Sequence, residues 1–142
     1  KRETPFLVEV AYLVYNDGRL LHHVVAEEQK IDADIMSSML TAVNDFVADS
    51  FGTDGYLGLL QYGDHTVMIE KGTNCYIVAV LLGDGNDELR KTIAKQVNLI
   101  ETTKRSDLKG WGGDISRFDS CNSNLIKILL QSTARNREDV FD

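Results

Sequence analysis

Apolar residues occupy both alternating sets of positions in two short stretches of the chain, residues 6–15 and 75–82. A strand that is apolar on both faces is buried on both sides, so each stretch predicts an interior strand of a sheet. After the first stretch come Asp17 and Gly18, which tolerate the positive φ of a tight hairpin, and then a second apolar run. The pattern predicts a hairpin whose second strand, residues 19–28, lies nearer the edge of the sheet.

The segment after the hairpin has the periodicity of an amphipathic helix. Its apolar residues recur at spacings of three and four and share one broad face: Ile35, Met36, Met39, Leu40, Val43, Phe46 and Val47. Asp32 suits the N-cap, and Asp34 suits the first turn, where the helix dipole favours a negative charge. Gly52 predicts the end of this helix.

Three further strands are predicted in quick succession, over residues 56–62, 66–71 and 75–82, with turns containing glycine between them. The first and fifth strands are the most apolar, so we expect them side by side at the centre, each carrying its hairpin partners outward. The predicted fold is an α/β (α+β) sandwich around a five-stranded antiparallel sheet in the order 2-1-5-4-3. The long helix then crosses between the two edges.

Both faces of such a sheet need a cover, and the C-terminal part of the chain supplies the second one. A helical stripe follows the capping residues 84–87, and it consists of Leu89, Ile93, Val97 and Ile100. Residues 107–119 are predicted as a loop or short turn and residues 123–133 as a final helix, which gives the topology β-β-α-β-β-β-α-α. We expect one domain over residues 1–134 and a charged, frayed tail at 135–142.

Charge and composition narrow the classes of function. The chain has 142 residues, of which 43% are hydrophobic, and a net charge of −7. Nucleic acid is disfavoured as a partner because phosphate contacts need a concentrated basic surface. No apolar run approaches the ~20 residues of a spanning helix, so we expect no membrane insertion within this chain.

The two cysteines are too few for a disulfide framework and favour a reducing compartment. We expect Cys75 to be a buried thiol, whereas Cys121 lies in a polar segment and could be exposed. The expected location is the cytoplasm, either as a free protein or as the cytoplasmic part of a larger, membrane-attached one.

No motif predicts catalysis. His22 and His23 are adjacent in a strand and point to opposite faces, and His65 lies in a turn, so the histidines predict no metal site. The acidic residues at 84–88 look like a calcium loop, but Lys95 stands at the twelfth position, and helix capping explains the cluster. We therefore predict that the chain is not an enzyme and binds no cofactor.

Two glycine-rich segments predict turns. Residues 83–85 join a strand to a helix, which is the right context for phosphate binding, but they lack the lysine and hydroxyl residue of a P-loop. Residues 110–113 follow no strand. For Trp111, which lies among these glycines, two interpretations stay open: a plug at one end of the core, or an exposed anchor for a partner.

The order of elements resembles the longin and roadblock superfamily, in the longin variant that begins directly with the hairpin. At the residue level the chain is also similar to a domain of archaeal and some bacterial multidomain signalling proteins. Residues 12–20, 38–43 with 46–51, and 111–114 carry this similarity, which spans about residues 6–130. These motifs are structural rather than catalytic.

The resemblance implies a non-enzymatic interaction or regulatory module of a larger signalling or trafficking protein, which forms homodimers or binds a small GTPase. An edge strand offers unpaired backbone groups to such a partner. We expect Tyr56, Leu60 and Tyr62 on one edge to contact it, together with Trp111. The competing hypothesis is a small-ligand sensor, like PAS, GAF and profilin-like domains, which needs a cavity of several hundred Å³.

Overall fold

The computed structural model describes residues 4–26, 33–50 and 55–141, without the side chains of residues 33, 35, 56, 58, 59 and 62. Its strands are β1 (Leu7–Tyr15), β2 (Leu20–Val25), β3 (Gly55–Tyr62), β4 (His65–Lys71) and β5 (Cys75–Leu82). Its helices are α1 (Ala33–Asp49), α2 (Asp87–Thr103), α3 (Arg105–Leu108), η1 (Ile115–Cys121, a 3₁₀ helix), α4 (Asn122–Leu129) and α5 (Arg137–Phe141).

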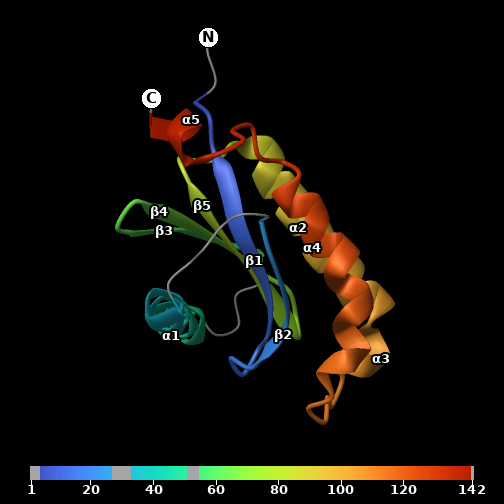
Figure 1. The fold of residues 1–142 in the computed structure, drawn as a ribbon. Coiled ribbons are helices and arrows are strands. Elements are labelled where there is room, and N and C mark those ends of the chain that lie inside the picture. The colour runs from blue at the N-terminus through green and yellow to red at the C-terminus, as the bar shows by residue number, and fades with distance from the viewer. Residues whose placement is uncertain (1–3, 27–32, 51–54, 142) are drawn as a thin grey trace.

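The five strands form one antiparallel sheet in the order β2-β1-β5-β4-β3, which confirms the predicted fold class. α1 lies on one face of the sheet, and α2 and α4 lie next to each other on the other face (Figure 1). The predicted pairing of the first and fifth strands is confirmed, because β1 pairs with β5 along its whole length. β5 is buried throughout, as its unbroken apolar sequence requires.

The face covered by α2 and α4 holds the larger core, which we call the helical-face core. Side chains of β1, β2, β4 and β5 meet the predicted stripe of α2 there, and that stripe is buried as expected: Leu89, Ile93, Val97 and Ile100. Asn86 begins α2 as its N-cap, and its side chain accepts a hydrogen bond from the N–H of Leu89 at 2.8 Å. α3, η1 and α4 complete this face with Leu108, Phe118, Leu125 and Ile128.

The opposite face holds a smaller core under a single helix, which we call the α1-face core. Met39, Val43 and Val47 of α1 pack on strand residues of β1, β4 and β5. The apolar face predicted for this helix is thus confirmed where its side chains are described. The proposed N-cap Asp32 and helix stop Gly52 lie outside the described residues.

The C-terminal third differs from the prediction. The segment expected to be a loop contains α3 and η1, and α4 ends at Leu129, before the predicted position 133. Residues 137–141, expected to be a frayed tail, form α5, and Arg137 lies 3.0 Å from Asp64. The chain also folds back on its start, because the N–H groups of Thr133 and Ala134 donate to the carbonyl of Phe6.

Candidate functional site

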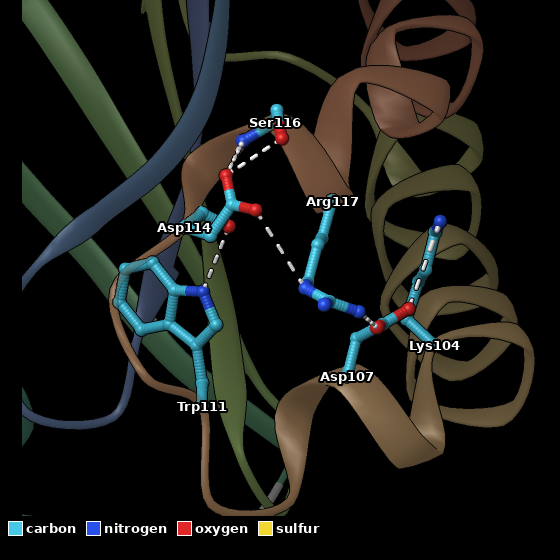
Figure 2. A network of polar contacts seen from close by, with 6 residues as sticks. All are labelled: Lys104, Asp107, Trp111, Asp114, Ser116 and Arg117. Atoms are coloured by element: carbon cyan, nitrogen blue, oxygen red, sulfur yellow. Dashed lines mark hydrogen bonds and ion pairs between the residues drawn. The ribbon is translucent and has the colours of Figure 1, made fainter.

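A network of polar contacts fixes the loop that contains Trp111 (Figure 2). Asp114 caps η1 by accepting hydrogen bonds from the hydroxyl and the backbone N–H of Ser116, at 2.6 and 3.0 Å. These bonds hold the pKa of the Asp114 carboxyl below its usual range. Arg117 lies between Asp107 and Asp114, at 3.1 and 3.7 Å, so the two ends of the loop are tied together.

The ring of Trp111 is turned into the molecule and is 8% exposed. Its centroid lies 5.2 Å from that of Tyr15 and 5.8 Å from that of Phe118, which it meets edge-on. The Nε1–H donates to the carbonyl of Asp114 at 3.0 Å, so the polar atom is satisfied inside the protein. Trp111 therefore plugs one end of the core, the first of the two interpretations. The ring is therefore not exposed as a partner anchor would be, and the partner contact predicted for Trp111 stays a prediction.

Arg19 links this loop to the hairpin between β1 and β2. Its guanidinium lies 4.6 Å from the ring centroid of Trp111 and 5.7 Å from that of Tyr15, a cation–π arrangement. Asp17 of the same turn pairs with it at 2.8 Å. The turn itself uses Gly18, whose φ of 96° favours glycine, as the Asp-Gly sequence predicted.

β3 is one edge of the sheet and carries three of the residues predicted to contact a partner. Leu60 is half-buried and packs against the α1-face core, so only part of it is free. The side chains of Tyr56 and Tyr62 lie outside the described part of the structure. The partner contacts on β3 stay a prediction. The strand contains no charged residue along its length.

β2 is the other edge, and it also contains no Asp, Glu, Lys or Arg. Leu20 and Val25 are 38% and 45% exposed, whereas Leu21 and Val24 are buried in the helical-face core. Leu20 and Val25 lie on the α1 side of the sheet. There α1 packs on β1, β4 and β5 but not on β2, so these two side chains are left uncovered. Sequence reasoning named β2 an edge but did not single out these residues.

The histidines lie in three separate environments. The Nε2 of His22 is hydrogen-bonded to the side-chain oxygen of Asn122 on α4 at 2.9 Å, while His23 stacks on Tyr12 with a centroid distance of 6.0 Å. The two side chains thus point to opposite faces of β2, as predicted. His65 begins β4, and its Nε2 lies 2.6 Å from the Glu9 carboxylate.

No pattern in the sequence predicted the contact between Glu9 and His65. Glu9 stands at a register irregularity where β1 pairs with β5, between Val8 and Val10. Such a bulge redirects one side chain, and here a carboxylate that is 5% exposed reaches across to β4. Its burial is explained by the histidine partner, since a lone buried carboxylate is strongly disfavoured.

Both cysteines are buried and free, so the exposure considered for Cys121 is wrong. η1 turns this residue into the helical-face core, where Cys75 also lies. Burial raises the pKa of both thiols, which keeps them protonated and unreactive. Glu101 of α2 accepts hydrogen bonds from the N–H groups of Asn74 and Cys75, at 2.7 and 3.0 Å, and fixes the turn between β4 and β5.

A surface hollow of about 430 Å³ lies between α2 and β4. Its lining includes the small residue Ala94 and four charged side chains: Glu70, Asp87, Arg90 and Lys91. Burial raises the pKa of Glu70, and Arg90 opposes that shift.

Within the described residues, no three His, Cys, Asp or Glu side chains are grouped as a metal site would need. None of the described helices has the length and apolar character needed to cross a bilayer.

The strand order and the covering helices define the class of protein: an α+β sandwich with a five-stranded antiparallel sheet between helices. This is the fold that the resemblance to the longin and roadblock superfamily implied.

Comparison with protein-family models and with curated proteins gives no match. Among solved structures, the chain is similar to the gliding protein MglB from Thermus thermophilus, with 12% identity, a TM-score of 0.42, and coverage of 88% of this chain and 80% of that one. It is also similar to MglB in a tetrameric arrangement, with 15% identity, a TM-score of 0.42, and coverage of 86% and 80%. At these TM-scores the similarity supports no argument about function. The fold class is assigned from the strand order and the covering helices of this chain itself.

Proposed function

We propose that this chain is a non-enzymatic protein-interaction and regulatory module, and that it binds through the edges of its sheet. One observation carries the proposal: neither edge strand, β2 or β3, contains a charged residue or a proline. Natural sheets protect their edges with such residues because unpaired N–H and C=O groups accept any strand that approaches. Edges without this protection suit strand addition by a partner.

The partners we propose are a second copy of the chain and a small GTPase, within a larger signalling or trafficking protein. Self-association is supported by the apolar side chains Leu20 and Val25, which stand exposed on an edge. The small GTPase rests on the family resemblance alone. A direct test is whether the purified chain binds small GTPases of its source cell, loaded with GDP or with a non-hydrolysable GTP analogue.

Charged substitutions at each edge test the proposal as a whole. Val25→Lys places a charge on β2, Gln61→Lys places one on β3, and Leu99→Lys on α2 is the control, at an exposed apolar residue that belongs to neither edge strand. Sedimentation velocity and capture of proteins from a lysate of the source cell are compared across the variants. We expect at least one edge variant to lose an association that the control keeps. The proposal is wrong if neither edge variant differs from the control.

A small-ligand sensor is the second candidate, favoured by the hollow beside Glu70. A half-buried carboxyl with a raised pKa, next to an arginine, gives this hollow polar groups that could orient a small polar ligand. A ligand that raises the melting temperature of the wild-type chain but leaves Glu70→Gln unchanged would establish this function. A screen of small polar metabolites without any such shift would dismiss it.

A further inference from the structure

We propose that a surface hollow beside Trp111 binds the phosphate group of a small phosphorylated molecule. The hollow lies where α3, the glycine-rich loop after it and η1 meet (Figure 2). We call it the Trp111 hollow, and its volume of about 330 Å³ is within the range of small-molecule sites. It belongs to neither edge strand, so binding here is independent of the proposed function. Its lining consists of Ser106, Asp107, Lys109, Gly110, Trp111, Gly112, Asp114 and Arg117.

Three successive residues of the lining have backbone donors without a partner. Within the described part of the chain, the N–H groups of Gly110, Trp111 and Gly112 donate to no backbone or side-chain acceptor. The indole of Trp111 differs, because its Nε1–H is already bonded to the carbonyl of Asp114. Successive free N–H groups in a loop are a common feature of anion sites. The loop therefore has hydrogen bonds available for an anion in the hollow.

Neither the conformation nor the packing of the loop explains the glycine at position 112. The φ of Gly112 lies outside the left-handed region, so other residues can adopt this conformation. A Cβ placed there would meet no atom within 4 Å apart from its chain neighbours, so a side chain would also fit. A glycine at such a position leaves its N–H group uncovered and lets a ligand approach the backbone closely. Gly110 is different, since its φ of 69° itself favours glycine.

Positive charge exceeds negative charge at the Trp111 hollow. The cations are Lys109 and Arg117 of the lining and Lys104, which pairs with Asp107, and the anions are Asp107 and Asp114. Three cations and two anions leave one positive charge, on a chain whose net charge is −7. The Lys109 side chain has no ion pair within the described residues, so its ammonium group is available to a ligand. An anion is thus attracted to this part of an otherwise acidic surface.

The two carboxylates of the hollow already have partners. For Asp107, Oδ1 lies 3.1 Å from Nη1 of Arg117 and Oδ2 lies 4.0 Å from Nζ of Lys104. For Asp114, Oδ1 accepts hydrogen bonds from Ser116 and Oδ2 lies 3.7 Å from Nε of Arg117 (Figure 2). These contacts offset the repulsion that a bare carboxylate exerts on an anion. They also hold the guanidinium in place while leaving its Nη2 donors unused among the described residues.

A phosphate group suits these donors better than a carboxylate does. A phosphate monoester carries about −1.5 to −2 charges at pH 7 and has three strong acceptor oxygens. A carboxylate has only two oxygens, whereas the hollow offers donors from the loop backbone, from Lys109 and from Arg117. Arginine and lysine are both common phosphate ligands. Because the contacts of Asp107 and Asp114 fix the loop before a ligand arrives, little further ordering is needed on binding.

Nuclear magnetic resonance of the isotope-labelled chain tests the site directly. Inorganic phosphate and adenosine monophosphate are the probes, with sodium chloride at equal ionic strength as the reference. We expect the backbone amide signals of Trp111 and Gly112 to shift until they saturate. The indole N–H signal should shift less, because that group stays bonded to Asp114. Saturable shifts with either probe support the proposal, and the two affinities show whether free phosphate or a phosphate ester binds more tightly.

Two variants of the hollow complete the test. Lys109→Gln removes the unpaired ammonium group, and we expect the dissociation constant for the better probe to rise about tenfold. Gly112→Val covers the backbone N–H and should weaken binding while the chain stays folded, because the position is open and unstrained. Lys95→Gln removes the same charge from an exposed site on α2 and is the matched control. Circular dichroism checks the fold of each variant.

Two results would overturn the proposal. One is the absence of saturable shifts at residues 110–112 with both probes. The other is equal affinity of Lys109→Gln and Lys95→Gln, which would show that the chain attracts phosphate only through its general charge. Neither result bears on the edge variants, whose partners are measured separately.

Discussion

The two faces of the sheet are built differently. On the face of α2 and α4, apolar packing and several polar contacts between distant parts of the chain hold the helices to the sheet. On the α1 face, a single helix covers the sheet. The helical-face core includes residues from four strands and from every helix between α2 and α4. The α1-face core includes residues of three strands and of α1, with partly buried neighbours from β3.

Polar contacts on the helical face link elements that are far apart in the sequence. The hydroxyl of Tyr15 donates to the carbonyl of Leu108 at 2.8 Å, and Asn124 of α4 donates to Gln96 of α2 at 2.8 Å. Glu101 holds the turn between β4 and β5. Each contact fixes one helix against the sheet or against its neighbour, so this layer resists separation at several points.

On the α1 face, Asn44 accepts a hydrogen bond from the hydroxyl of Tyr76 and also approaches Gly18 of the hairpin. The outward side of α1 is polar, and the helix leaves Leu20 and Val25 of β2 uncovered. The difference teaches that the two layers hold the sheet to different extents. The helical layer is tied to the sheet at several points, and the lighter α1 side leaves Leu20 and Val25 of β2 exposed, at an edge where we propose binding.

Removal of the Trp111 ring should have the largest effect on the helical face. Trp111→Ala deletes a side chain that packs on Tyr15 and Phe118 and carries the Arg19 contact, so we expect a loss of about 3–5 kcal/mol in the free energy of unfolding. Urea denaturation measures it. Ile115→Ala, an exposed neighbour on η1, should change stability by less than about 0.5 kcal/mol. If the two variants were equally stable, Trp111 would not be the plug we describe.

The architecture could be predicted because burial imposes a periodic pattern on the sequence. β1 and β5 are apolar on both faces, and only the centre of a covered sheet accepts such strands. The three- and four-residue spacing of α2 likewise indicated which of its residues are buried. Each of these patterns can be read from a short stretch of sequence, without knowing which other elements pack against that stretch.

Details of the site could not be predicted because they depend on contacts between distant residues. Glu9 looks like an exposed position in a strand until the bulge in β1 brings it to His65. Cys121 lies among polar residues, and only the turn of η1 shows that it faces the core. For Trp111, the flanking glycines give no information on depth, which depends on Tyr15 and Phe118.

Loss of the Glu101 carboxylate should have the next largest effect on the helical face. Glu101→Ala leaves the N–H groups of Asn74 and Cys75 without their acceptor, and we expect a cost of about 2–3 kcal/mol. Glu101→Gln retains one acceptor oxygen and should recover about half of that loss. Urea denaturation of the three proteins gives the ranking. A Glu101→Ala variant as stable as the wild type would show that this contact does not hold α2 to the turn.

The smallest effect should appear on the α1 face, as a loss of stability at high pH. Burial raises the pKa of Tyr12 from 10.0 to about 12 and also raises that of Tyr76, and both side chains belong to the α1-face core. Between pH 10 and 12 the unfolded chain loses the Tyr12 proton while the folded chain keeps it, so the stabilisation present below pH 10 is lost as the pH rises. We expect roughly 1–2 kcal/mol of this decline to come from Tyr12.

Tyr12→Phe isolates that contribution, because it removes the titrating hydroxyl and keeps the ring. Urea denaturation of wild type and variant at several pH values above about 9 should show a shallower decline for the variant, and parallel curves would contradict the burial of this hydroxyl. Adding Tyr76→Phe should flatten the curve further, although it lowers stability at every pH by removing the bond to Asn44. A decline carried by these two tyrosines would assign this alkaline loss of stability to side chains of the α1-face core.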